Sequence, residues 1–155
     1  MTKKLLALAS LGLFNMSAHA DGLNPRTVNE FDLNRYMGRW YEIESTQHAR
    51  QTDCTCTSAE YSINNDDSVR VVNSCRLGHP TGLLAQVEGN AVPNALNPAA
   101  LTFNSGRFPF LFPNYFITMV NDDYSFAVVS APLKSDLWVL SRSRTLAADE
   151  LKNIH

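Results

Sequence analysis

The sequence carries little charge, and charge of one sign does not accumulate anywhere along it. Charged residues make up 18% of its 155 positions, and the formal net charge is −2. It contains no basic run, which argues against nucleic acid as a partner. A hydrophobic share of 45% with ordinary aromatic content argues against disorder. The length allows one domain with one sizeable core.

Long apolar runs are also lacking. The most apolar stretch, from Leu5 to Phe14, is shorter than the roughly 20 residues that a membrane-spanning helix needs. Two lysines precede it, and Ala18-His19-Ala20 follows it with the small-x-small pattern of a signal-peptidase site. We therefore expect residues 1–20 to be a signal peptide and residues 21–155 to be the mature domain. The alternative is an N-terminal membrane anchor.

Cysteine is scarce, with Cys54, Cys56 and Cys75 as the complete set. All three lie after the expected cleavage site, so one disulfide is plausible in an oxidising compartment and one thiol is left over. None stands at the cleavage site, where a bacterial lipid anchor would require it. We expect an exported protein, periplasmic or secreted, that is not lipid-anchored.

The motifs of common catalytic and metal sites are missing. Cys54-Thr55-Cys56 does not have zinc-ligand spacing, and no nucleophile elbow, phosphate loop or dinucleotide fingerprint occurs. The histidines show no metal-ligand spacing either: they are His19, His48, His79 and His155. We expect no metal, no cofactor and no enzymatic activity.

What the sequence does contain is a series of short β-rich runs separated by Asn, Asp, Gly and Pro. Turn residues at 64–67 and 121–123 predict hairpin loops. Two short helices are expected, one capped by Asp32 and one over 146–154. We predict eight strands, over residues 39–46, 55–63, 69–76, 83–92, 100–104, 115–121, 126–130 and 137–141.

Alternation within these runs indicates strands with one face in a core and one in water. Ala59, Tyr61 and Ile63 share one face, for example, and polar residues lie between them. A long meander closes most simply on itself, because closure removes exposed edges. The predicted fold class is all-β, an eight-stranded antiparallel up-and-down β-barrel with a short C-terminal helix. A barrel of this size holds one small ligand, and a two-sheet sandwich remains the alternative.

Three short signatures carry a family resemblance. Gly38-Arg39-Trp40 has the Gly-x-Trp pattern that opens the first strand of a lipocalin, and Asp122-Asp123-Tyr124 is similar to the later Thr-Asp-Tyr signature. Arg142 matches the arginine that follows the last strand. Over about residues 27–152 the sequence resembles the lipocalin family, and within it the bacterial and apolipoprotein D-like members.

The resemblance implies a lipocalin calyx in which the signature residues are structural. Arg142 is expected to lie over Trp40, where a guanidinium gains cation–π energy from an indole face. Gly38 is expected to allow the tight turn into the first strand. The structural set is Gly38, Trp40, Asp123, Tyr124 and Arg142.

The resemblance also implies that the barrel carries or stores a small hydrophobic or amphiphilic ligand of the fatty acid or lysophospholipid class. Glu42 and Glu44 alternate with Trp40 onto the same face; each is either a polar contact for a ligand head group or a rim carboxylate paired within the protein. By alternation and by the match to the family, the residues expected to line the interior are Tyr61, Val71, Val87, Phe103, Ile117 and Trp138.

The cysteine pairing depends on the register of the hairpin around 64–67. Pairing Tyr61 with Val71 favours burial and puts Cys56 on the face opposite Cys75, whereas a register shifted by one would pair Cys56 with Cys75. The resemblance favours a disulfide between Cys54 and Cys75, with Cys56 free.

Two other functions remain as alternatives. One is an enzyme on the same fold that uses a free cysteine as its nucleophile, and the other is a protein-interaction module that uses the loop 108–113. That loop is either a hydrophobic lip that touches a membrane or an acyl chain, or a segment that packs over the barrel end. The residues proposed for membrane contact are Phe108, Phe110, Leu111 and Phe112.

Overall fold

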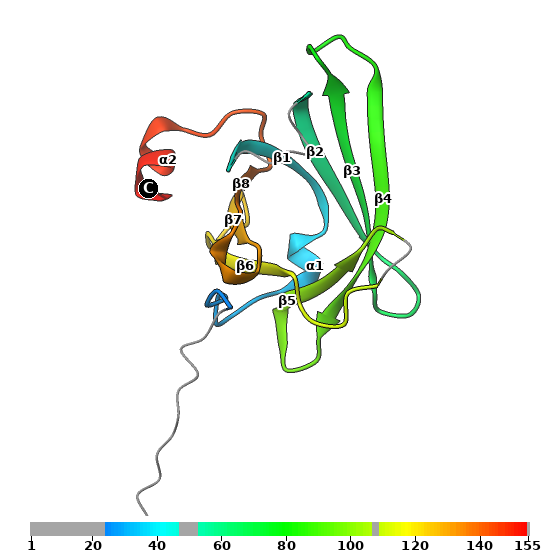
Figure 1. The fold of residues 1–155 in the computed structure, drawn as a ribbon. Coiled ribbons are helices and arrows are strands. Elements are labelled where there is room, and N and C mark those ends of the chain that lie inside the picture. The colour runs from blue at the N-terminus through cyan, green and yellow to red at the C-terminus, as the bar shows by residue number, and fades with distance from the viewer. Residues whose placement is uncertain (1–23, 47–52, 107–108, 155) are drawn as a thin grey trace, which may run out of the picture.

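Eight strands form a closed antiparallel barrel in which each strand pairs with its neighbours in the sequence and β1 pairs with β8 (Figure 1). The computed structural model describes residues 24–46, 53–106 and 109–154. The expected signal peptide, Phe108 and three of the four histidines lie outside the described residues. The closed barrel confirms the predicted fold class and excludes the sandwich.

The predicted strands are all present, and their ends differ from the prediction by at most three residues. α2 follows the last strand and lies outside the barrel (Figure 1). None of the helices in the described residues is long and apolar enough to cross a membrane. The elements are α1 Leu33–Tyr36, β1 Gly38–Ser45, β2 Cys54–Ile63, β3 Val69–Leu77, β4 Leu84–Asn94, β5 Asn97–Asn104, β6 Tyr115–Val120, β7 Phe126–Ser130, the 3-10 turn η1 Pro132–Lys134, β8 Leu137–Ser141 and α2 Ala148–Ile154.

The hairpin of β2 and β3 has the register that burial favours, with Tyr61 opposite Val71. Its pairing shifts between Thr55 and Ser58, where Cys56 has a φ of 53° in the left-handed region. This bulge leaves Cys56 exposed and free. Cys54 and Cys75 form the disulfide, with their Cα atoms 5.4 Å apart, so the predicted pairing is confirmed.

Trp40 closes one end of the barrel and is completely buried. Its indole nitrogen donates to the Tyr36 carbonyl at 2.8 Å, and the Arg142 guanidinium lies 3.8 Å from the centre of the indole ring. The same guanidinium donates to the carbonyls of Arg39, at 2.9 Å, and Arg35, at 2.7 Å. One side chain therefore joins the end of β8 to β1 and α1.

The other signature residues have structural roles at the same end. Gly38 has a φ of 91°, in the left-handed region that favours glycine, and a Cβ there would be in ordinary contact with Arg142 Nη1 at 3.4 Å. Asp123 accepts a hydrogen bond from the Ser125 backbone at 3.0 Å. The Tyr124 hydroxyl accepts one at 2.7 Å from the backbone of the residue that caps α1, Asp32.

Replacing Arg142 should weaken the fold. Arg142→Ala removes the cover of Trp40 and three charge-assisted hydrogen bonds, to the carbonyls of Arg39, Arg35 and Tyr124, so we expect the free energy of unfolding to fall by about 1–3 kcal/mol. Arg142→Lys keeps the charge but loses the planar guanidinium group with its several donors. It should therefore recover only part of the lost stability. Urea denaturation measures both. Arg144→Ala, which removes a cation–π contact to Tyr41, is the control and should cost less. An Arg142→Ala variant that unfolds like the parent but loses ligand would show that Arg142 is a binding residue.

Candidate ligand-binding site

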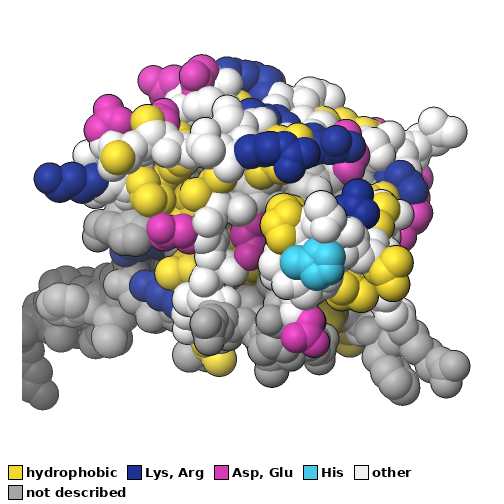
Figure 2. Space-filling view, turned by 90° about the horizontal axis from the view of Figure 1, so that it is seen from above, with side chains coloured by type: hydrophobic (Ala, Val, Ile, Leu, Met, Phe, Trp, Pro, Cys, Tyr) yellow, Lys and Arg dark blue, Asp and Glu magenta, His cyan; other side chains and the backbone are white. Residues whose placement is uncertain are grey.

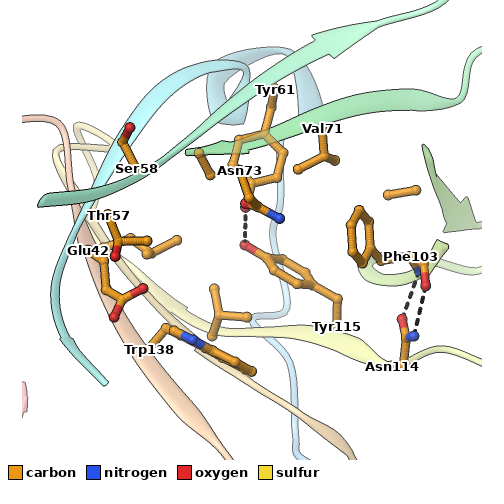
Figure 3. A pocket seen from close by; sticks show the side chains of 14 residues that line it. Glu42, Thr57, Ser58, Tyr61, Val71, Asn73, Phe103, Asn114, Tyr115 and Trp138 are labelled. Carbon is orange, nitrogen blue, oxygen red and sulfur yellow. Dashed lines mark hydrogen bonds between the residues drawn. The ribbon is translucent and has the colours of Figure 1, made fainter. Parts of the chain in front are cut away.

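A cavity of about 190 Å³ lies inside the barrel (Figure 3). Its wall combines apolar and aromatic side chains with a few neutral polar ones and one carboxylate. The described lining residues are Glu42, Thr57, Ser58, Ala59, Tyr61, Val71, Asn73, Ala91, Phe103, Asn114, Tyr115, Val129, Trp138 and Leu140. A mostly apolar cavity with a few convergent polar groups is typical of small-molecule sites.

Four of the six residues expected in the interior line this cavity: Tyr61, Val71, Phe103 and Trp138. Ile117 is completely buried in the core instead. Val87 is 53% exposed, because β5 pairs with β4 only as far as Asn90 and leaves the start of β4 uncovered on that side. Contact of any of these six residues with a ligand stays a prediction.

Alternation carried further along the strands would have found several lining residues that we did not select. Ala59 shares the face of Tyr61, Asn73 that of Val71, and Leu140 that of Trp138. Tyr115, at the start of its strand, shares the face of Ile117.

No sequence pattern indicated that Asn114 lines the cavity, because its role depends on tertiary structure. Its side-chain amide accepts from the Phe103 backbone nitrogen at 2.7 Å and donates to the Phe103 carbonyl at 2.9 Å. It thereby takes the place of a strand neighbour for β5.

The two glutamates of β1 have different positions. Glu42 lines the cavity, and its Oε1 accepts a hydrogen bond from the Ser45 hydroxyl at 2.6 Å. The pairing of β1 with β8 shifts between Glu42 and Glu44, and Glu44 is exposed. Strict alternation, which put both on one interior face, fails at this bulge.

Three tyrosine hydroxyls meet in the barrel interior. Tyr115 shares hydrogen bonds with Tyr36, at 2.7 Å between oxygens, and with Tyr61, at 2.9 Å. Burial raises the pKa of Tyr61 to about 12 and raises the pKa values of Tyr36 and Tyr115 well above the usual value. The cavity therefore ends on neutral phenols that accept and donate hydrogen bonds.

The two features behind the alternative functions lie away from the cavity wall. Cys56 is exposed, and the described lining contains no cysteine. Phe110, Leu111 and Phe112 are 61%, 82% and 78% exposed. The alternative in which this loop packs over the barrel end is therefore wrong for these three side chains. Within the described residues, no group of three or more His, Cys, Asp or Glu is placed to hold a metal ion.

Comparisons with known proteins agree with this geometry. A family model described as a lipocalin-like domain matches residues 31–155. Outer membrane lipoprotein Blc of Escherichia coli K12 is 31% identical over 150 residues, which cover 95% of this chain and 83% of that protein. Apolipoprotein D of Cavia porcellus is 30% identical over 129 residues, covering 79% and 67%.

Among solved structures, insecticyanin from the tobacco hornworm Manduca sexta has a TM-score of 0.62 at 21% identity, covering 86% of this chain and 74% of its own. The cockroach allergen Per a 4 has the same TM-score at 15% identity, covering 86% and 84%. At these identities the likeness concerns the fold alone.

The chain belongs to the lipocalin family. Membership indicates a protein that binds small hydrophobic ligands, and it favours binding over catalysis. The relative from Escherichia coli is named an outer membrane lipoprotein, which differs from our expectation of a protein without a lipid anchor.

The buried tyrosines predict a loss of stability at alkaline pH. Their folded-state pKa values lie above 10, the value of an exposed phenol, so the stability that depends on neutral phenols is complete below pH 10. It is lost as pH rises through about 12 for Tyr61. Tyrosinate absorbance followed beside far-UV circular dichroism should show these phenols ionising only as the barrel unfolds. Tyr115→Phe should make this loss smaller, and ionisation of all three near pH 10 in a folded barrel would contradict the assignment.

Proposed function

We propose that this protein carries or stores one small amphiphile in the barrel cavity, of the class to which fatty acids and lysophospholipids belong, and that it catalyses no reaction. The observation that supports this most is the convergence of Tyr61, Val71, Phe103 and Trp138 on one cavity. Burial of apolar ligand surface there contributes roughly 25 cal/mol per Å².

The size of the cavity limits what enters it. A volume of about 190 Å³ is a little larger than the roughly 150 Å³ of a dry apolar cavity that holds one benzene molecule. A short or slender apolar group fits this space. A long acyl chain would have to continue through the mouth of the barrel or displace wall side chains such as Phe103 and Trp138.

A charge placed in the cavity wall should oppose binding. We expect Tyr61→Glu and Phe103→Glu to weaken binding by about tenfold or more, because a carboxylate there must stay hydrated or become protonated. Glu60→Lys, on the exterior face of the same strand as Tyr61, should change affinity little. Titration of delipidated protein with fatty acids, lysophospholipids and polyaromatic probes, followed by tryptophan emission, measures this, since Trp138 lines the cavity.

Each variant needs a melting curve beside its titration, so that loss of binding is separated from loss of fold. The proposal fails if all three kinds of probe leave both the emission and the melting temperature of folded, delipidated parent protein unchanged.

We further propose that the open end of the barrel touches a membrane when ligand is exchanged. Up-and-down topology puts the loops that follow β3, β5 and β7 at one end of the barrel. On the face of the molecule that Figure 2 shows from above, hydrophobic side chains are exposed among charged ones. Leu83, Leu111 and Phe112 are 78–82% exposed, which is typical of an interaction surface when such residues cluster.

Vesicle flotation tests this contact. The parent protein should float with phosphatidylcholine vesicles, and a double variant Leu111→Ser with Phe112→Ser should float less. Leu96→Ser is a matched control, because Leu96 is 97% exposed but lies in the β4–β5 turn at the other end. Equal flotation of all three would exclude this loop as the contact.

The export of this protein is a proposal of its own. We propose that residues 1–20 are cleaved before Asp21 and that the mature chain carries no lipid. Intact-mass measurement of protein recovered from its host should give the mass of 21–155 with one disulfide. A mass increased by acyl chains, or one that retains residues 1–20, would refute it.

A further inference from the structure

The described wall of the cavity has one charged side chain, and that charge is negative. It is Glu42; Lys, Arg and His are absent from the described lining. Glu42 stands two residues after the buried Trp40 on β1, and two residues place it about 7 Å along the strand from the closed end. The carboxylate lines the cavity and extends toward the open end, where it meets Ser45, the last residue of β1.

Cations of the described residues do not neutralise this carboxylate. One of its oxygens, Oε1, accepts from the Ser45 hydroxyl at 2.6 Å, and we find no hydrogen bond to Oε2 within the described part of the chain. The nearest basic residue before it in the sequence, Arg39, pairs instead with Glu60 at 2.8 Å on the exterior. Among the described residues, the carboxylate therefore keeps one acceptor for a ligand that enters the cavity.

Aromatic rings surround the same space. Tyr61, Phe103, Tyr115 and Trp138 all line the cavity, and Figure 3 draws the Glu42 carboxylate on the side of the cavity where Trp138 lies. The faces of aromatic rings attract cations, most strongly when water is excluded. An anionic head group would instead lose hydration beside a like charge.

We propose that the cavity selects an amphiphile whose head group is an organic ammonium over one of the same chain length whose head group is a carboxylate. This rests on the proposed function, because it names the head group of the amphiphile that the cavity binds. The positive nitrogen lies against Glu42 and the face of Trp138, and the apolar chain packs along Val71 and Phe103.

A series with one chain and three head groups tests this selection. Delipidated protein is titrated by calorimetry with octylammonium, octanoate and 1-octanol, so that the contribution of the chain cancels. We expect octylammonium to bind about tenfold more tightly than octanoate, with 1-octanol between them.

Two isosteric variants identify the source of the preference. Glu42→Gln keeps the volume and removes the charge, so octylammonium should bind about fivefold more weakly and octanoate more tightly, and the affinity for 1-octanol should change least. Glu44→Gln makes the same change in net charge at an exposed position of the same strand, and it should change each affinity less than about twofold.

The outcomes separate this inference from the function on which it rests. If octanoate or 1-octanol binds as tightly as octylammonium, the selection is wrong and the carrier function stands. If folded protein binds none of the three, the selection is wrong, and the titrations with fatty acids, lysophospholipids and polyaromatic probes decide whether the carrier function fails with it. If Glu44→Gln acts as strongly as Glu42→Gln, the preference comes from overall charge and the assignment to Glu42 is overturned. The titrations of the parent protein decide the selection even if a variant does not fold.

Discussion

Closure of the sheet between β1 and β8 is the constraint on which the rest of the molecule depends. β1 pairs with β2 on one side and with β8 on the other, and without the second pairing both terminal strands would be open edges. Arg142 follows β8 directly and bonds to the carbonyls of Arg39 and Arg35 while it covers Trp40. It holds the first and last strands together at the closed end.

The character of the cavity follows from that closure. Glu42 comes from β1, and Trp138 and Leu140 come from β8, so the seam between these strands supplies both the charge and the largest ring of the wall. Below them the buried Trp40 and the bonded hydroxyls of Tyr61 and Tyr115 fill the interior. The result is a short cavity with an acidic side wall and a neutral polar end. The length of the cavity limits the size of the ligand, and the side wall sets which head-group charge is preferred.

The period-two alternation of the sequence predicted most of the strands and much of the cavity lining. The residues for which this prediction failed have physical explanations. Alternation was right for Tyr61 and Val71 because the pairing of β2 with β3 is regular from Ser58 to Ile63. It gives the face of a strand but not the depth, so it could not separate Ile117 in the core from residues that border the cavity. It also assumes that a strand has neighbours along its whole length, which is untrue for Val87.

Alternation could not predict the irregular features of the strands. The bulges between Glu42 and Glu44 and between Thr55 and Ser58 change the direction of the side chains that follow. No local sequence pattern marks either of them. The role of Asn114 depends on a strand distant in the sequence. Such positions need the three-dimensional register, since their signal lies in pairing rather than in composition.

The seam between β5 and β6 sets where the barrel wall is weakest. Its ladder consists of two paired positions, Ala100 with Phe116 and Leu101 with Tyr115, and beyond them the side chain of Asn114 supplies the bonds to Phe103. Short ladders open at lower free energy than long ones. We therefore expect local opening of the wall to cost least beside Phe103 and Tyr115, where the side chain of Asn114 takes the place of further strand pairing.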